Sequence, residues 1–363
     1  MSMKTLSSLL PLGWLVFAAA LLPGQAMALA YQNGAGVSAL SSTNDSAYGF
    51  LDGVGYVLTS NPAQGNYVAC SGTALSSRLV LTSAHCFDFD YSNSTDNSRT
   101  MFYTWGGTGA SRGLTQYNGS VVVAPQHEIT QVGGYKAYND LALIVLDTPL
   151  AASTPTYAVY AGDLSAEALS KLQAGAMLVG YGQHHEEGQL ISAGSAYDRW
   201  VGYTKVSGYD PQRGGTISAT LVEGTSILAP GDSGGPLISW TQSGGAPLGV
   251  VFGTAAYARD NQGNGHYTDM GDEAFWSFTG SVAEFIQQVA AQNGETVRFF
   301  SGPASSLTSC PLGSTCTGFP AASSTSGTGS VPGVPEPGQL SLMAVGLVTL
   351  LGLTRRRRKA EAA

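Results

Sequence analysis

Short apolar runs separated by polar turns fill two blocks of the chain, residues 47–150 and 176–278. No long helical pattern alternates with these runs. Regularly spaced short strands of this kind indicate antiparallel sandwiches or barrels, so the pattern predicts an all-β protein. The clearest predicted strands are residues 54–58, 78–81, 120–123, 141–146, 177–180, 199–203, 236–240 and 248–252.

Two segments follow a helical pattern instead. Residues 166–172, within the connector 151–174 between the blocks, predict a short helical turn. After the second block, Ser281 and Glu284 have the spacing of a capping box, and apolar residues at helical spacing continue toward Gly294;. We expect this second helix to pack against the body of the protein.

Composition fits a loop-rich β protein and argues against one class of partner. Only 11% of the 363 residues are charged, and the formal net charge is −8;. Without Lys4 and the basic residues 355–359, and without Glu336 and Glu361, the body carries 10 basic and 22 acidic residues, a net charge of −12. Such a surface repels nucleic acids, so no nucleic-acid partner is expected.

The amino-terminal 30 residues have the layout of a secretory signal peptide. Lys4 precedes an apolar stretch over residues 9–22, and small residues then allow cleavage after Ala28 or Ala30;. A buried first helix is the alternative interpretation. Residues 31–46 would then be an amino-terminal segment or a propeptide.

Export places the chain in an oxidising compartment, where its four cysteines are expected to pair;. Cys70 and Cys86 flank a strand-like segment, and Cys310 and Cys316 enclose a short loop. Of the three connectivities that four cysteines allow, we favour Cys70–Cys86 with Cys310–Cys316.

The carboxyl-terminal region combines a tether with a membrane-directed tail. Residues 295–333 form a linker that is rich in Ser, Thr, Gly and Pro;. Val-Pro-Glu-Pro at 334–337, an apolar run at 340–353 and a basic cluster at 355–359 follow. The run is shorter than the roughly 20 residues of a bilayer-spanning helix, and the basic cluster would stay on the cytoplasmic side.

This order of features over residues 334–359 resembles the PEP-CTERM sorting signal of Gram-negative bacteria. The resemblance implies an exported protein of the cell envelope or the extracellular space. It also implies a membrane segment before processing, and cleavage near the motif by a membrane-embedded exosortase-type enzyme. A plain tail anchor is the alternative.

Three short segments carry the chemistry of a reactive serine. Thr-Ser-Ala-His-Cys at 82–86 supplies His85, Asn-Asp-Leu-Ala-Leu at 139–143 supplies Asp140, and Gly-Asp-Ser-Gly-Gly-Pro-Leu at 231–237 supplies Ser233. A serine hydroxyl is a poor nucleophile until a base, oriented by a third group, takes its proton. Each residue alone has a structural explanation, but together they predict acyl transfer by an activated serine.

These segments resemble those of trypsin-like (chymotrypsin-fold) serine peptidases over about residues 47–294. The resemblance implies two antiparallel six-stranded β-barrels and a carboxyl-terminal α-helix. The first barrel would occupy residues 47–150, and the connector, the second barrel and the helix would occupy residues 151–294. It also supports the Cys70–Cys86 bridge and implies protein or peptide substrates, with no cofactor and no metal.

The resemblance assigns a role to each matching residue. Ser233 would attack the scissile carbonyl, His85 would take and return its proton, and Asp140 would orient the imidazole. The backbone N–H groups of Gly231 and Ser233 would form the oxyanion hole. Asp232 would have a structural role, because in this family it pairs with a newly exposed amino terminus.

Two features depart from the family pattern. Ile227 stands at the usual pocket floor, and with Phe252 and Gly253 as further pocket residues it predicts cleavage after uncharged, apolar residues. No Lys or Arg lies between Lys4 and Arg78, so trypsin-type propeptide cleavage cannot occur there. Signal cleavage itself yields the working terminus, another protease trims residues 29–45, or Asp232 has a different partner.

Weaker signals lie near these motifs. Asp88, Asp90, Asn93 and Asp96 could surround calcium, but the expected turn glycine is absent, so a solvated loop is favoured;. The segment His-His-Glu-Glu at 184–187 lacks the spacing of a zinc peptidase helix, which favours an exposed loop;.

The tyrosine-rich segment 135–138 either borders the substrate cleft or packs in a turn.

For the whole chain, an exported serine endopeptidase is the leading hypothesis. The rivals are an inactive peptidase-like module that binds envelope or matrix components, and a structural surface protein with an incidental motif.

Overall fold

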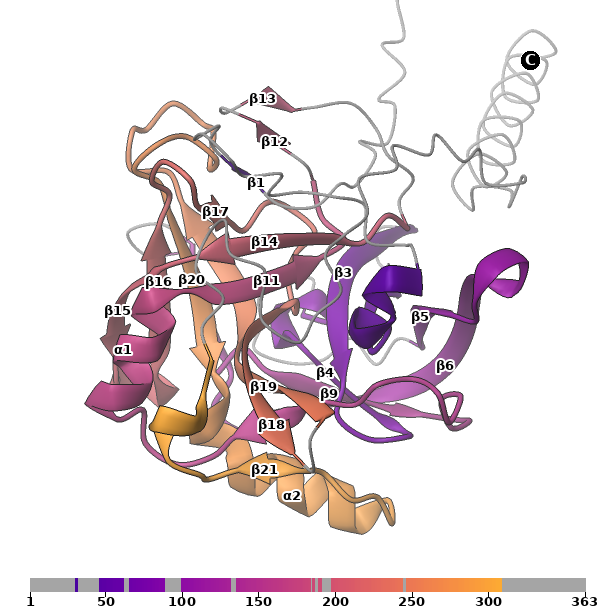
Figure 1. Cartoon of the computed structure of the whole chain (residues 1–363). Helices are drawn as coiled ribbons and strands as arrows, with labels where there is room; N and C mark the ends of the chain where they lie inside the picture. Colours follow the sequence, from indigo (N-terminus) through magenta and orange to yellow (C-terminus); the bar gives the residue numbers. More distant parts are fainter. Residues whose placement is uncertain are drawn as a thin grey trace, which may run out of the picture. The chain divides into compact units, whose positions relative to one another are not determined.

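Strands dominate the computed structural model, which describes residues 30–31, 46–61, 65–88, 99–131, 135–183, 185–186, 189–190, 197–243 and 246–308. Each predicted strand overlaps an observed one, so the all-β prediction is confirmed (Figure 1). The strands form one closed barrel, one large open sheet and two small sheets.

Six strands of the first block close into an antiparallel barrel in the order β2-β3-β4-β9-β6-β5. A buried cluster made by this block alone includes Val57, Val80, Phe102 and Ile144. Small barrels are filled by such side chains. The strands are β2 (Val54–Asn61), β3 (Asn66–Ala74), β4 (Leu79–Thr82), β5 (Thr100–Gly106), β6 (Gly113–Val123) and β9 (Ala142–Leu146).

The same strands also bury a second set of side chains, against the other block. Leu58, Leu81 and Leu143 each stand next in the chain to a residue of the first cluster. They share a second cluster with Ile238 and Val251 of the second block. Successive side chains of a strand point to opposite faces, so a strand can be buried on both sides. This shared cluster holds the two blocks together.

The second block forms a half-barrel, in the order β14-β11-β18-β19-β20-β16-β15. The predicted six-stranded closure is not found among the described residues, because the end strands β14 and β15 of this order do not pair with each other. The path strands are β11 (Ala176–Gly180), β14 (Trp200–Thr204), β15 (Val206–Asp210), β16 (Thr216–Thr220), β18 (Pro236–Ser243), β19 (Ala246–Arg259) and β20 (Glu273–Phe278). A short strand, β10 (Ala158–Tyr160), pairs with β19, and a second one, β21 (Phe299–Phe300), pairs with β10.

Two small sheets complete the strand structure. Strands β7 (Glu128–Thr130) and β8 (Lys136–Tyr138) form a hairpin just before β9. The other sheet has the order β13-β12-β1-β17, so the amino-terminal strand β1 pairs with two segments that are distant in sequence. Its strands are β1 (Ala30–Tyr31), β12 (His185–Glu186), β13 (Gln189–Leu190) and β17 (Ser226–Ile227).

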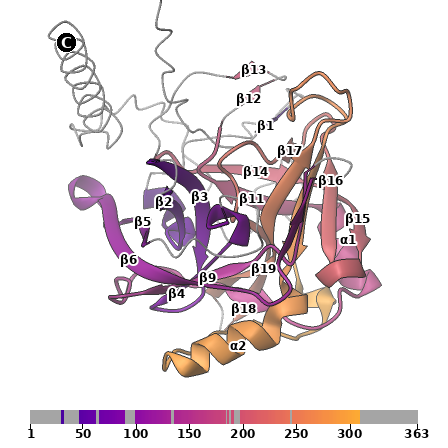
Figure 2. The same ribbon diagram turned by 180° about the vertical axis from the view of Figure 1, so that it is seen from behind.

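Both predicted helices are present, as α1 (Ala166–Ala174) and α2 (Ala283–Gln292). The predicted capping box is wrong: Ser281 lies in the 3₁₀ turn η5 (Thr279–Val282), and its Oγ donates to the carbonyl of Phe278. The extra turn moves the start of α2 beyond Ser281. Val282, Ile286 and Val289 join the cluster shared by the two blocks, so α2 packs on the body as expected (Figure 2).

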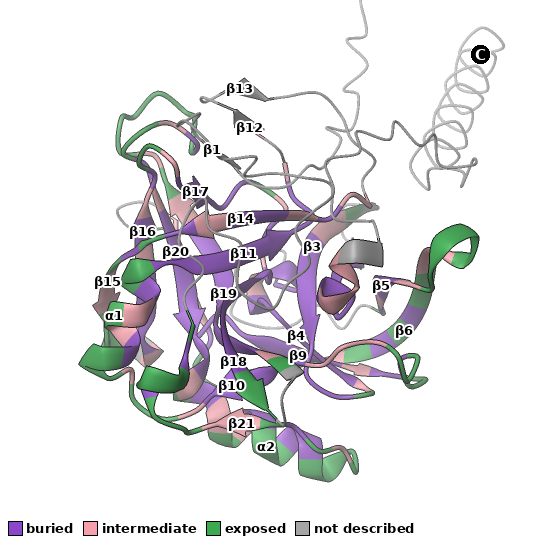
Figure 3. Cartoon of the chain, in the orientation of Figure 1, coloured by how far each residue is buried: buried purple, intermediate pink, exposed green. Residues whose placement is uncertain are grey.

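Short 3₁₀ turns connect several strands, and exposed residues concentrate on the outer faces of both helices and at hairpin tips (Figure 3). These turns are η1 (Ser46–Leu51), η2 (Ala84–Cys86), η3 (Gly109–Ser111), η4 (Gln212–Gly214) and η6 (Ala304–Ser306). Within the described residues, no helix has the length and apolar character needed to cross a membrane.

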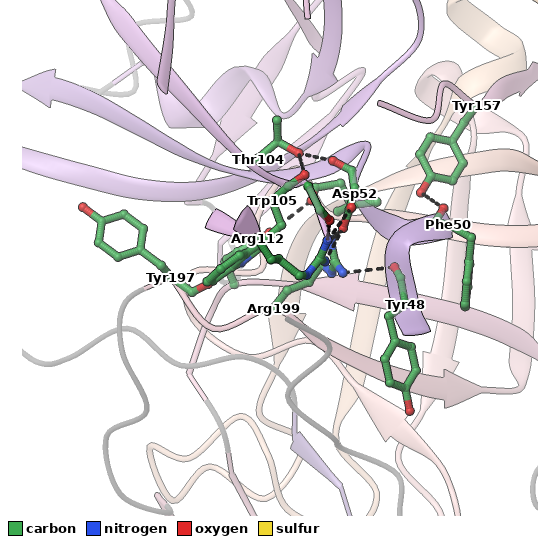
Figure 4. Close-up of polar contacts among 12 residues, drawn as sticks. Tyr48, Phe50, Asp52, Thr104, Trp105, Arg112, Tyr157, Tyr197 and Arg199 are labelled. Atoms are coloured by element: carbon green, nitrogen blue, oxygen red, sulfur yellow. Dashed lines mark hydrogen bonds and ion pairs between the residues drawn. The ribbon is translucent and has the colours of Figure 1, made fainter. Parts of the chain in front are cut away.

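A buried ion-pair cluster also joins the two blocks (Figure 4). The carboxylate of Asp52 accepts hydrogen bonds from Arg112 at 2.7 and 2.9 Å, and from Arg199 at 3.0 Å. Arg199 is fully buried, and its second terminal nitrogen donates to the carbonyl of Tyr48. Because a guanidinium keeps its proton, Asp52 lies between two permanent cations.

Candidate active site

His85 lies on η2, directly after the buried strand β4. The next residue, Cys86, forms a disulfide with Cys70 on β3, which confirms the predicted pairing. The turn is held by β4 on one side and by the disulfide on the other, and this limits the directions in which the imidazole of His85 can point. Cys310 and Cys316 lie outside the described residues.

Asp140 lies two residues before β9 and is completely buried. Its Oδ2 is 2.6 Å from His85 Nδ1, and its Oδ1 accepts a hydrogen bond from the backbone N–H of His85 at 2.8 Å. An ionised carboxylate can only accept, so a hydrogen bond to it requires the proton on Nδ1, which leaves Nε2 of a neutral ring as an acceptor. This is the arrangement that a general base requires.

Two hydroxyls of the second block hold the backbone of Asp140. Its N–H donates to Ser277 Oγ at 3.1 Å, and its carbonyl accepts from Thr254 Oγ1 at 3.3 Å. Neither residue could be predicted from the sequence, because nothing in the segments around them marks a contact with Asp140. The half-barrel therefore positions a residue that the barrel supplies.

The segment before Ser233 is shaped by close backbone contacts. Gly231 has a φ of +96°, and a Cβ there would lie 2.7 Å from the Cα of Gly182. Asp232 is fully buried; its Oδ1 accepts from the N–H of Gly182 at 2.9 Å and its Oδ2 from the N–H of Ala229 at 2.8 Å. The carboxylate of Asp232 thus holds the loop that carries Ser233.

Ser71 links this loop to the barrel. Its N–H donates to the carbonyl of Ser233 at 2.7 Å, and its Oγ donates to the carbonyl of Gly231 at 3.3 Å. The same Oγ accepts from the N–H of Tyr181 at 3.0 Å. Ser71 follows the disulfide cysteine Cys70, and that adjacency is the signal in the sequence that could have indicated its role.

His85 and Ser233 line one cleft of about 440 Å³. In the described part of the chain, no hydrogen bond joins Ser233 Oγ to His85 Nε2. Among the same residues, the backbone N–H groups of Gly231 and Ser233 donate no hydrogen bond to another group. Further cleft walls come from residues 228–230 and 255–258, which are largely apolar.

The comparison with known families agrees with this geometry. The family model described as Trypsin matches residues 55–275, which is more than half of the chain. This chain belongs to the trypsin family. A second model, described as the PEP-CTERM protein-sorting motif, matches residues 333–359.

Within this trypsin-family domain, the predicted pocket residues do not line the cleft. Ile227 is fully buried in β17, and Phe252 is fully buried with its ring stacked on Tyr160 at 4.4 Å. Gly253 lies against Trp276. The wall that lines the cleft includes residues 255–258, where the register between β19 and β20 shifts.

Aromatic rings extend one wall of the cleft. Tyr135 contacts His85 edge-on at a centroid distance of 6.3 Å, and Tyr257 contacts Tyr135 at the same distance. Tyr257 stacks on Phe275 at 4.4 Å. Burial, with a smaller contribution from Tyr138, raises the pKa of Tyr257 to about 12. Its phenol therefore stays a neutral hydrogen-bond donor over the physiological pH range.

The weaker sequence signals divide between described and undescribed residues. Asp88 lines the cleft, whereas Asp90, Asn93 and Asp96 lie outside the described residues. His185 contacts Gln183 and Thr268, while His184 and Glu187 are also outside. The one described group with the spacing of metal ligands is Cys70, His85 and Cys86, and its cysteines are joined in a disulfide.

Proposed function

We propose that this chain is an exported serine endopeptidase that cleaves peptide bonds through an acyl-enzyme. The observation that carries the proposal is the 2.6 Å contact between His85 Nδ1 and Asp140 Oδ2, beside a cleft that Ser233 also lines. It orients Nε2 as the acceptor for the serine proton. Hydrogen bonds between nucleophile and base are often looser in a free enzyme than in its substrate complex.

The proposed reaction uses the chain's own groups. Ser233 Oγ attacks the carbonyl carbon of the scissile bond while His85 Nε2 takes the hydroxyl proton. The N–H groups of Gly231 and Ser233 stabilise the oxyanion of the tetrahedral intermediate. His85 then donates the proton to the leaving amine as the C–N bond breaks, and a water molecule attacks the acyl-enzyme with the same proton transfers. Asp140 stabilises the imidazolium at each step.

The composition of the cleft supports uncharged, apolar residues on the acyl side of the cleaved bond. Leu228, Ala229, Ala255 and Ala256 form its walls. These walls give no partner to an arginine or lysine head group, which would lose its hydration unpaired. Asp88, the carboxylate among the lining residues, has a side chain that is only 1% exposed and faces His127. Digestion of a peptide library is expected to show cleavage after apolar residues, and a strong preference for Arg or Lys would contradict this.

The two chain ends support export and processing. Residues 1–30 would direct secretion, and the PEP-CTERM motif at 333–359 would direct an exosortase-type enzyme of a Gram-negative envelope to the tail. Ala30 and Tyr31 pair in β1, which favours cleavage after Ala28, because that cut keeps both residues of the strand. Mass spectrometry of both ends of the exported protein tests these assignments.

Active-site labelling tests the enzymatic proposal directly. A fluorophosphonate probe is expected to label the exported protein, and Ser233→Ala is expected to abolish the label. Ser243→Ala, at an exposed serine on β18, is the matched control and should label normally. A folded protein that does not label would instead support the peptidase-like binding module.

A further inference from the structure

A second histidine lies against the carboxylate of Asp140. His127 directly precedes β7, and its side chain is only 3% exposed. Its Nδ1 is 3.8 Å from Asp140 Oδ1, and its Nε2 is 3.4 Å from Asp88 Oδ2. The side chains of Asp88 and Asp140 are themselves 1% and 0% exposed. A buried imidazole therefore stands between two buried carboxylates.

Packing alone gives no reason for a histidine at this position. Neither ring nitrogen makes a hydrogen bond of ordinary geometry with any described residue. Burying polar atoms without such partners costs free energy, whereas an aromatic hydrocarbon of similar shape would not incur that cost. Both nitrogens nevertheless lie within ion-pair distance of a carboxylate oxygen.

The four side chains form one connected series. Asp88 faces His127, His127 faces Asp140 Oδ1, and Asp140 Oδ2 binds His85 Nδ1. His127 is not among the residues that line the cleft, so it would act on His85 through Asp140, while its other neighbour, Asp88, itself lines the cleft. The other charged residues on its hairpin are Glu128 and Lys136.

We propose that His127 is a positioning residue of the active site, which holds Asp140 against His85 and moderates the negative charge that the carboxylate presents to the imidazole. This inference rests on the proposed function. An N–H of His127 directed at Oδ1 draws negative charge away from the carboxylate. Without it, the more negative Asp140 would stabilise the imidazolium of His85 more strongly, and His85 would return the proton on Nε2 to the leaving group less readily.

Two substitutions test this in the full chain. His127→Phe keeps a planar ring and removes both nitrogens, and His127→Gln keeps one donor without a titratable ring. We expect kcat to fall about 10- to 100-fold in His127→Phe, with KM nearly unchanged, and a smaller fall in His127→Gln. The acidic limb of the kcat/KM profile should move to higher pH by about half to one unit in His127→Phe. His266→Gln, at an exposed histidine, is the matched control and should change neither quantity.

A second readout does not depend on activity. In a Ser233→Ala background, ¹⁵N NMR titration of His85 should show its midpoint moved in the same direction by His127→Phe. If both His127 variants fail to fold, the His85 curve of the Ser233→Ala protein should instead show a second inflection where His127 titrates. The proposal would be overturned if the His85 midpoint is unchanged in folded His127 variants. It would also be overturned if the His85 curve of the Ser233→Ala protein shows a single inflection. Absence of fluorophosphonate labelling would reject the proposed function but leave this titration readable.

Discussion

Asp52 and Asp140 are two buried carboxylates where the blocks meet, and their partners differ. Asp52 is bound by the guanidinium groups of Arg112 and Arg199, whose charges are fixed at any ordinary pH;. Asp140 faces the imidazole rings of His85 and His127, and an imidazole, unlike a guanidinium, can take up and release a proton;.

The difference in partners separates two functions of a buried charge. A carboxylate between fixed cations joins segments of chain and gives nothing to proton transfer. A carboxylate beside imidazoles responds each time a ring gains or loses a proton, as catalysis requires. The Asp52 cluster should therefore control stability, and the Asp140 cluster should control activity.

The strongest test of this separation is Asp140→Asn. The amide can present an N–H to His85 Nδ1, which favours the wrong tautomer, so we expect kcat/KM to fall by about 10⁴-fold. The free energy of unfolding should change little, because the amide oxygen can still accept from the backbone N–H of His85 while the NH₂ faces Nδ1. Steady-state kinetics measures kcat/KM, and urea unfolding measures the free energy of unfolding. A large loss of stability with a modest loss of activity would contradict the separate functions of Asp52 and Asp140.

The converse test is Asp52→Asn. It leaves two buried guanidinium groups without their counter-charge, so we expect the free energy of unfolding to fall by about 3–5 kcal/mol. Turnover per labelled active site should stay near that of the unchanged protein. The control is Asp147→Asn, which breaks the exposed pair with Arg99 and should cost less than about 1 kcal/mol;.

Asp232 sharpens the comparison, because its carboxylate accepts hydrogen bonds from the backbone N–H groups of Gly182 and Ala229. In Asp232→Asn one of these N–H groups would face an amide NH₂, and the Ser233 loop would shift. We expect a fall in kcat of about 10²-fold, similar to the loss of one oxyanion donor, and about 2 kcal/mol less stability. Fluorophosphonate labelling rates and urea unfolding would show both effects; a loss in only one would mean that loop position and stability are separable.

The smallest expected effect concerns Tyr181, whose hydroxyl donates to the carbonyl of Val54. At neutral pH, Tyr181→Phe should lower the free energy of unfolding by about 1 kcal/mol. Burial raises the pKa of Tyr181 to about 12, from 10.0 in the exposed residue. The unfolded chain therefore loses this proton first, and stability falls as pH rises from 10 toward 12. Tyr181→Phe has no phenol to ionise at this position, so its stability should not fall in this way. The difference in the free energy of unfolding between the two proteins should therefore narrow in urea titrations at pH 11. The same difference at neutral pH and at pH 11 would contradict the raised pKa of Tyr181.

Much of the fold could be predicted from local pattern. The predicted strands, both helices and the Cys70–Cys86 bridge are confirmed. They are recognisable because alternation, helical spacing and short motifs are written in consecutive residues. The capping box at Ser281 was wrong, because a 3₁₀ turn and an α-helix share the same local signals there.

The cleft wall was harder to predict than the residues of the proposed triad. His85, Asp140 and Ser233 stand in short motifs, whereas the wall at residues 255–258 depends on an irregularity in the pairing of β19 with β20. A shift of this kind changes which residues of a long strand face the cleft. It follows from packing on the neighbouring strand, and no local pattern marks it.

The sequence alone therefore determined which segments become strands, which residues can carry the chemistry, and which family the chain resembles. The tertiary structure decided what those residues touch: Ser71 on the Ser233 loop, Thr254 and Ser277 on the backbone of Asp140, and His127 between two carboxylates. The physical reason is that strand propensity acts between near neighbours in the chain. Charge and hydrogen bonding act between atoms that only the closed barrel and the half-barrel bring together.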